Sequence, residues 1–382
     1  MSPPASTLPL TLPQLISIIV PTLNEAPNLP ELARRIHAAM TTAVAPIAQY
    51  ELLIVDDNSQ DDTKVVCATL TRQYPLTLHT RTTPKDGLSG AVLHGFSLAR
   101  GDTLLVIDAD LQHPPESIPA LLATLDAGAE FALGSRYIAG GGIASSWSAF
   151  RRLNSTIATL LARPFSGKVT DPMSGFFALR RTTFNRATHL SPLGYKIALE
   201  LMCKCRVQKV VEVPIHFGLR HAGTSKLTLK QQFKYLEHLS RLYDFTFPRA
   251  SPILKFLIAT TASWLASLAA LAPLLATGSS LLTAVALAFP ISLLTLAAFH
   301  WRYVNTQREF LPRQRPWTDF TTIATAEYAA ALLTAAWLQS RAPNLPPAEA
   351  VAITFTLAAA VRYALRKELL ADIRGLRQES RA

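Results

Sequence analysis

The stretch DTLLVIDADLQHPPESIPALLATLDAG, residues 102–128, joins an unbroken apolar run to an amphipathic run through two aspartates, Asp108 and Asp110. The apolar run predicts a strand buried on both faces of a sheet, and the segment from Pro115 predicts a helix. Charged groups at the end of a buried strand are costly unless something binds them, and neighbouring carboxylates repel each other. A cation bound between the two aspartates would relieve both effects.

The same alternation of apolar and amphipathic runs continues on both sides, from residue 15 to residue 137. The expected strands are LISIIVP (15–21), YELLIVDD (50–57), LTLHTR (76–81), DTLLVIDAD (102–110) and EFALGSRY (130–137). The expected helices are NLPELARRIHAAM (28–40), DTKVVCATLTRQY (62–74), SGAVLHGFSLAR (89–100) and PESIPALLATLDAG (115–128). Apolar strands separated by helices predict an α/β fold whose mostly parallel sheet is covered by helices on both faces.

Polar residues gather just after the expected strands, where a parallel sheet binds its ligands. They are Glu25, Asp56, Asp57, Asp108, Asp110 and Arg136. Residues two apart in an extended segment face the same way, so Asp108 and Asp110 are expected to address one ion. Carboxylate oxygens without nearby His or Cys select Mg²⁺ or Mn²⁺, normally together with substrate phosphates, and the amide of Gln112 is a candidate third ligand. Most Asp-x-Asp pairs are solvated loop acids, but a strand end favours the ion site.

The composition favours a membrane protein with anionic partners. The 382 residues leave room for two domains, and 37 Lys and Arg against 26 Asp and Glu give a net charge of +11. Only 16% of the residues are charged and the mean hydropathy is +0.22. Three cysteines, Cys67, Cys203 and Cys205, have neither disulfide-framework nor zinc-site spacing. Residues 1–14 have no signal-peptide pattern and predict a flexible leader.

The C-terminal third of the chain predicts membrane spans. Residues 256–299 contain no charged residue and no histidine. This stretch is long enough for two membrane spans. Two weaker spans are expected near 320–340 and 346–365, so the region predicts about four transmembrane helices. A buried soluble hairpin is the alternative for the first pair. Arginines concentrate between the second and third spans and in the C-terminal tail, which places these segments and the N-terminal domain on the cytoplasmic side of the cytoplasmic membrane.

A basic amphipathic helix is expected between the two regions, within SKLTLKQQFKYLEHLSRLYDFTFPR (225–249). Lysines recur every four residues from Lys226 to Lys234, and apolar residues every three from Phe233 to Leu242. Such a helix is suited to an anionic membrane surface, and the alternative is a helix that packs on its own domain.

Eight motifs together resemble the family 2 glycosyltransferases of GT-A (Rossmann-like) fold, and among them the dolichol-phosphate and polyprenyl-phosphate mannosyltransferases. They are SIIVPTLNEAPNLPEL, ELLIVDDNSQDDT, DGLSGAVLHGF, VIDADLQHPPE, GSRY, DPMSGFFALRR, GYKIALE and VEVPIHFGLRHAGTSKL, and they cover about residues 15–247. The C-terminal region resembles the GtrA-like membrane domain. The implied division is a leader (1–14), a transferase domain (15–225), an interfacial segment (226–250) and a membrane domain (251–382).

The resemblance implies a role for each matching residue. It assigns donor-nucleotide binding to Pro21, Leu23, Glu25, Val55, Asp57, Asp108 and Ala109. It assigns the metal to Asp108, Asp110 and Gln112, and the acceptor phosphate to Arg136, Arg151, Arg152, Arg220 and Lys226. Asp110, Arg136 and Arg220 are implied to be catalytic. The family usually has Tyr where this chain has Leu23, so the expected aromatic contact with the nucleoside is missing.

The implied reaction transfers a sugar, with mannose from GDP-mannose as first choice, to a polyprenyl phosphate at the cytoplasmic face of the membrane. The lipid phosphate attacks the anomeric carbon and gives an inverted, β-linked product. A phosphomonoester has a second pKa of about 6, so no general base is needed. The alternatives are transfer from UDP-glucose or another UDP-sugar, and an inactive transferase that binds or flips lipid-linked sugar. A homo-oligomer is left open.

Two other functions are disfavoured by the sequence. A processive polysaccharide synthase usually carries Gln-x-x-Arg-Trp, which this chain lacks. Nucleic-acid binding is not expected, because much of the basic excess borders the expected spans instead of interleaving with aromatic residues on the N-terminal domain.

Overall fold

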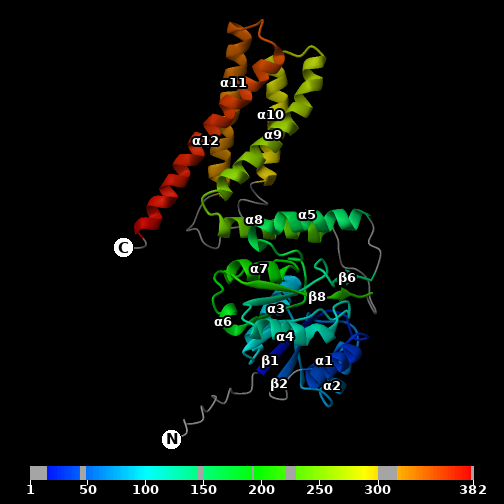
Figure 1. Ribbon diagram of the computed structural model, residues 1–382. Helices are drawn as coiled ribbons and strands as arrows, with labels where there is room; N and C mark the ends of the chain where they lie inside the picture. The colour runs from blue at the N-terminus through cyan, green and yellow to red at the C-terminus, as the bar shows by residue number, and fades with distance from the viewer. Residues whose placement is uncertain are drawn as a thin grey trace. The chain divides into compact units, whose positions relative to one another are not determined.

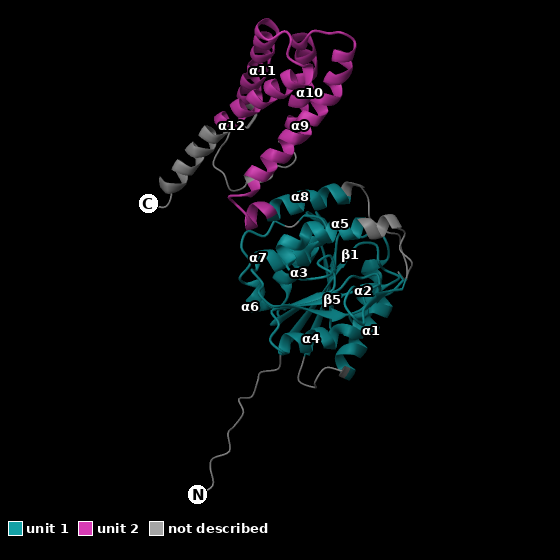
Figure 2. Ribbon diagram, turned by 45° about the horizontal axis from the view of Figure 1, so that its top comes forward, with its two compact units in different colours: residues 1–242 teal, residues 243–382 magenta. Residues whose placement is uncertain are grey.

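The computed structural model describes residues 15–43, 49–144, 149–191, 193–219, 229–299 and 316–379. The chain forms two compact units, residues 1–242 and residues 243–382 (Figure 2). Each unit has its own core, and each is described below by itself.

The first unit is built on a seven-stranded sheet with the strand order β3-β2-β1-β4-β7-β5-β8 (Figure 1). The strands are β1 Leu15–Thr22, β2 Gln49–Asp56, β3 Leu76–Thr80, β4 Thr103–Val106, β5 Phe131–Ser135, β7 Phe177–Arg180 and β8 Val210–Pro214. All pairings in this sheet are parallel except those of β7, which runs antiparallel to both β4 and β5. A second sheet pairs β6 Gly142–Ile143 with β9 His216–Phe217.

Helices cover both faces of the sheet, as the apolar strands predict. One face packs against α1 Leu29–Ala43, α2 Thr63–Leu70 and α4 Ile118–Asp126, and the other against α3 Gly87–Leu98 and α7 Ile197–Lys204. Alternate residues of β1 enter the two cores, Ile18 on the first side and Ile19 on the second. This alternation is the strand period of two, and it explains why both neighbours must be apolar.

The described part of the first unit also contains α5 Ala149–Ser166, the short α6 Arg181–Phe184 and α8 Leu229–Thr246, and α8 extends into the second unit. The sequence predicts α8 as a membrane-facing amphipathic helix. Its Leu239 and Leu242 are buried in the core of the first unit, whereas Phe233 and Leu236 are 51% and 39% exposed. The helical period predicts which residues share a face, but it does not identify what that face contacts.

The second unit consists of α9 Ser251–Ala276, α10 Leu281–Phe299, α11 Pro316–Arg341 and α12 Pro347–Glu379. Among the residues that the structure describes, three segments are long and apolar enough to cross a membrane: Ile253–Ala276, Leu281–Phe299 and Pro347–Leu365. The expected span near 320–340 forms most of α11, which is not among them and carries Glu327 in its middle.

A buried ion pair joins α11 to α12. Glu327 Oε1 lies 3.3 Å from Arg362 Nη2, and the two side chains are only 3% and 5% exposed. The Arg362 guanidinium also lies 5.5 Å from the ring centre of Phe256 on α9. Removing one member of a buried pair leaves a charge without compensation, whereas replacing both members by apolar groups is often neutral.

We therefore expect Glu327→Leu alone to lower the stability of the second unit by about 3–5 kcal/mol, the usual effect of breaking a buried pair. The double substitution Glu327→Leu with Arg362→Leu should recover most of the loss. Thermal unfolding of the detergent-solubilised protein measures both. A single variant that unfolds like the wild type, or a double variant less stable than Glu327→Leu, would contradict this account.

Candidate active site

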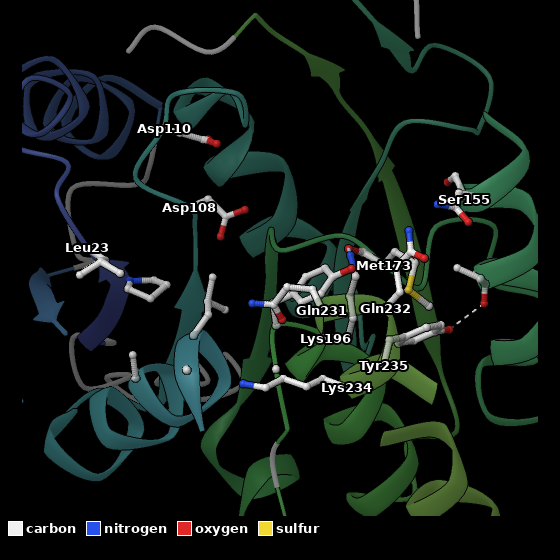
Figure 3. Close-up of a pocket in the computed structure, with 18 of the residues that line it drawn as sticks. Leu23, Asp108, Asp110, Ser155, Met173, Lys196, Gln231, Gln232, Lys234 and Tyr235 are labelled. Carbon is white, nitrogen blue, oxygen red and sulfur yellow. Dashed lines mark hydrogen bonds between the residues drawn. The ribbon is translucent and has the colours of Figure 1, made fainter. Parts of the chain in front are cut away.

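A pocket of about 820 Å³ lies at the carboxyl edge of the sheet (Figure 3). One side of the pocket is formed by residues at the ends of strands. Pro21 lies near the end of β1 and Leu23 follows that strand, Asp57 follows β2, Asp108 and Asp110 follow β4, and Arg136 follows β5. The opposite side comes from α5, the segment before α7, and α8, with Asn154, Ser155, Ile157, Leu161, Gly194, Tyr195, Lys196, Gln231, Lys234 and Tyr235 among the lining residues. Of the six strand-end residues singled out in the sequence, five line this pocket, whereas Asp56 is buried at the end of β2, where its carboxylate accepts from the Ser59 backbone N–H.

The donor-binding candidates fall into two groups. Pro21, Leu23, Glu25, Asp57, Asp108 and Ala109 line the pocket. Val55 is fully buried in the core on the α3 side of the sheet and is not among the lining residues. Asp57 Oδ1 lies 3.1 Å from Arg81 Nη1. Burial raises the pKa of Asp57 above its usual range, although the charge of Arg81 opposes this shift.

The metal candidates lie in a tight turn after β4. Leu111 has a left-handed backbone with φ of 61°, which an apolar side chain rarely adopts and which marks local strain. The Gln112 backbone N–H donates to Asp110 Oδ1 over 3.2 Å, and its side-chain amide donates to the Gly218 carbonyl over 3.2 Å. Gln112 is not among the pocket-lining residues, unlike Asp108 and Asp110.

The donor set fits a hard divalent ion bound together with a ligand. No cluster of three or more His, Cys, Asp or Glu that would hold a metal alone occurs among the described residues. Two carboxylates that border a cavity, Asp108 and Asp110, match the way Mg²⁺ is held, by one or two carboxylates with substrate phosphates.

Asp108 has two close neighbours that the sequence analysis did not identify. His113 is 3% exposed and its Nδ1 lies 3.5 Å from Asp108 Oδ2. Burial, with the nearby charges of Arg136 and Lys196, lowers the pKa of His113 to about 3, so the imidazole is neutral. Gly175 provides the space: a Cβ at this position would lie 2.7 Å from Asp108 Oδ2.

The orientation of Arg136 is fixed by Asp171, an acidic residue that the sequence analysis did not identify. Its Nε and Nη2 each donate to a different carboxylate oxygen of Asp171 over 2.7 Å, and Asp171 is completely buried. The guanidinium also lies 5.1 Å from the ring centre of Phe217. A bidentate pair with a planar partner fixes the orientation of the guanidinium where it borders the pocket.

Lys196 adds another cation at the pocket. Its Nζ donates to the Met173 carbonyl over 2.8 Å and lies 4.5 Å from the Tyr195 ring centre. Burial and the neighbouring Arg136 lower the pKa of Lys196 to about 8, while Asp171 and Asp108 oppose the shift. Lys196 belongs to the GYKIALE motif, which was the signal that could have identified it as a site residue. Its neighbours in space cannot be deduced from spacing along the chain.

The remaining phosphate-binding candidates are placed in part. Arg151 and Arg152 belong to α5, whose helical backbone is described at these positions without their side chains. Arg220 and Lys226 lie outside the described residues.

Known proteins similar to this chain are glycosyltransferases. Residues 17–187 match the family described as "Glycosyl transferase family 2". The dolichol-phosphate mannosyltransferase of Pyrococcus furiosus is 44% identical over 230 residues, which cover 59% of this chain and 63% of that protein. The Mycosarcoma maydis enzyme of the same name is 43% identical over 236 residues, covering 60% of this chain and 80% of that protein. The chain thus spans a little less than two thirds of the archaeal relative.

A third relative and a solved structure cover the same region. The polyprenol monophosphomannose synthase of Mycolicibacterium smegmatis is 36% identical over 220 residues, covering 55% of this chain and 80% of that protein. The glucosyl-3-phosphoglycerate synthase of Mycobacterium tuberculosis, solved with Mn²⁺, UDP and glucosyl-3-phosphoglycerate, is 21% identical. Its TM-score is 0.45, with 60% of this chain and 79% of that chain covered.

The close approach at Gly175 generates a test of the pocket's geometry. Gly175→Ala should lower the free energy of unfolding by about 1–3 kcal/mol, as overpacking does, because the new methyl group collides with the Asp108 carboxylate. Adding Asp108→Ala should remove the collision and restore stability. Gly218→Ala is the matched control, since its nearest neighbours would lie 3.7 Å from the new Cβ. Equal thermal unfolding of Gly175→Ala and the control would refute the geometry.

Proposed function

This chain belongs to glycosyl transferase family 2, and we propose that it transfers mannose from GDP-mannose to a polyprenyl phosphate. The observation that carries the proposal is the pocket at the sheet edge, where the carboxylates Asp108 and Asp110 and the cations Arg136 and Lys196 border one cavity. Relatives described as dolichol-phosphate mannosyltransferases, at 41–44% identity, support mannose as the sugar and a polyprenyl phosphate as the acceptor.

On the donor side, Asp57, Glu25 and Leu23 border the end of the pocket formed by β1 and β2 and would contact the nucleoside. Asp108 and Asp110 would hold Mg²⁺ or Mn²⁺ at the donor diphosphate. When bound, the metal acts as a Lewis acid that stabilises the departing nucleoside diphosphate. His113 lies beside Asp108 and is neutral, so it does not compete with the metal for the carboxylate charge.

On the acceptor side, the lipid phosphate would lie toward Arg136 and Lys196. The phosphate oxygen forms the new bond to the anomeric carbon while the bond from that carbon to the donor diphosphate breaks, which inverts the configuration and gives a β-linked product. Because the phosphate is already ionised near neutral pH, the protein needs only to orient the two anions and reduce their repulsion. No side chain has to accept a proton.

The isoprenoid chain would follow the apolar side chains of α5 and α8. Ile157 and Leu236 line the pocket and are 46% and 39% exposed, and Phe233 on α8 is 51% exposed. Three helices apolar enough to span a membrane support a membrane location, and the basic segment after residue 300 favours a cytoplasmic catalytic unit.

A donor screen tests the proposal. The purified full-length protein is given Mg²⁺, polyprenyl phosphate and one radiolabelled nucleotide sugar at a time. We expect a lipid-soluble product with GDP-mannose and a much smaller signal with UDP-glucose. A product with UDP-glucose alone would show that the donor is UDP-glucose instead of GDP-mannose. If no donor gives a product, the result would favour a protein that only binds or moves lipid-linked sugar.

Loss of one carboxylate should impair transfer without unfolding the protein. Asp110→Asn keeps the shape of the side chain and removes its charge, so we expect kcat to fall by about 100-fold or more, the usual scale for one electrostatic group in an active site. The control is Asp126→Asn, a 62% exposed side chain that pairs with Arg180. Unchanged turnover in Asp110→Asn would remove the metal assignment.

Lys196 should give the reaction an alkaline limit. Its pKa is lowered to about 8, so the ammonium is present below that pH and is lost as the pH rises through it. We expect kcat/KM for polyprenyl phosphate, which reports the free enzyme, to fall with an apparent pKa of about 8. Lys196→Arg keeps the charge and should abolish this limit below pH about 10, since arginine stays protonated there. The same limit in both proteins would exclude Lys196 as its source.

A further inference from the structure

The helix α8, which supplies part of the pocket wall, has a buried face on which one histidine stands among apolar residues. Tyr235, His238, Leu239 and Leu242 are 8%, 1%, 4% and 0% exposed and share one face of the helix. The apolar members pack into the core of the first unit, and the Tyr235 hydroxyl donates to the Ala158 carbonyl of α5 over 2.7 Å. His238 needs a different explanation, because an apolar residue would pack equally well at its place.

The partner of His238 is a carboxylate with no exposed surface. Glu200 on α7 is 0% exposed, and its Oε2 lies 2.7 Å from His238 Nε2. A carboxylate oxygen accepts, so Nε2 of His238 carries a proton in this contact. The other oxygen, Oε1, accepts from the Ser191 backbone N–H over 2.7 Å and lies 2.9 Å from Lys204 Nζ. One carboxylate therefore joins α7, α8 and the segment before α7.

Lys204 reinforces the hold on that segment. It is 3% exposed and donates to the His189 carbonyl over 2.6 Å and to the Ser191 hydroxyl over 2.8 Å. His189 has a left-handed backbone with φ of 53°, so this segment is held in an unfavourable conformation. It leads directly to Gly194, Tyr195 and Lys196, which line the pocket.

The cluster is costly as a purely structural element. Burial alone would raise the pKa of Glu200, but the hydrogen bond and charge of His238, with Lys204, hold it at about 2, so the carboxylate stays ionised. Buried ionic clusters seldom stabilise a fold more than well-packed apolar residues do, and their best-attested use is to fix one geometry. Glu200 does not line the pocket, so a direct role in the reaction is excluded by its position.

We propose that Glu200 is a positioning residue that sets the acceptor side of the pocket, by holding α8 through His238 and the Lys196 segment through Ser191 and Lys204. This inference rests on the proposed function for its substrate: the ligand that depends on the cluster is the lipid phosphate. The contacts of the cluster described above go to α8 and to the segment before α7, whereas the donor side is built on the ends of β1, β2 and β4 and should be little affected.

Steady-state kinetics on the full-length protein test the split between the two substrates. The variants are His238→Leu, which keeps the buried stripe apolar, and Glu200→Ala with its conservative counterpart Glu200→Gln. The control is Glu237→Gln, on the same helix, which weakens a partly buried ion pair with Arg241. Rates are measured well below each variant's unfolding temperature, varying polyprenyl phosphate at saturating GDP-mannose and the reverse.

We expect the KM for polyprenyl phosphate to rise about tenfold in His238→Leu and Glu200→Ala, the scale of one lost charge-assisted hydrogen bond, while the KM for GDP-mannose stays within about twofold. Glu200→Gln keeps hydrogen-bonding groups and should recover part of the loss. Equal rises in both KM values, or none in either, would overturn the positioning role.

Hydrogen–deuterium exchange supplies a readout that needs no turnover. In His238→Leu, amides of residues 229–246 should exchange faster than in the wild type, while those of β1 stay protected. Unchanged exchange in α8 would overturn the tether. A wild-type protein that transfers no sugar would instead refute the proposed function, and the exchange result would still decide whether the tether exists.

Discussion

The pocket at the sheet edge depends on one reversed strand. Because β7 runs antiparallel between β4 and β5, the segment that leads into it, residues 171–175, arrives at the edge where its neighbours end. From there Asp171 fixes Arg136, the Met173 carbonyl receives Lys196, and Gly175 leaves room for the Asp108 carboxylate. A wholly parallel sheet would place this segment at the opposite edge. The antiparallel direction of β7 therefore brings the partners of Arg136 and Lys196 to the pocket.

Much of this architecture could be predicted from the sequence, for physical reasons. Strands such as β1 and β4 are buried on both faces, so they appear as unbroken apolar runs that require covering helices. Once the sheet is expected to be mostly parallel, residues after its strands must gather at one edge, and Asp57, Asp108 and Arg136 do border one pocket.

The rest could not be predicted because it depends on contacts between distant residues. The strand β7 has only four residues, too few for a clear period, so neither its direction nor its partners were foreseen. Asp171 contacts Arg136, and Lys196 contacts the Met173 carbonyl. Each contact joins residues far apart in the chain, so no local sequence pattern predicts it. Val55 lies in the core although it belongs to a donor-binding motif, because β2 buries it against α3. The apolar face of α8 was visible, but its partner, the core of the first unit, was not.

If the sheet-edge pocket binds the donor nucleotide together with a metal ion, GDP and the metal should bind cooperatively. Equilibrium binding of GDP is the direct measurement. Titration of the purified protein with GDP, with Mn²⁺ and then with a chelator in excess, measures whether metal and nucleotide bind together. We expect tight binding with Mn²⁺ and at least about a tenfold weaker affinity without it, because the GDP diphosphate would then face the like charges of Asp108 and Asp110. In Asp108→Asn combined with Asp110→Asn the metal effect should disappear. Equal GDP affinity with and without metal in the wild type would contradict the account.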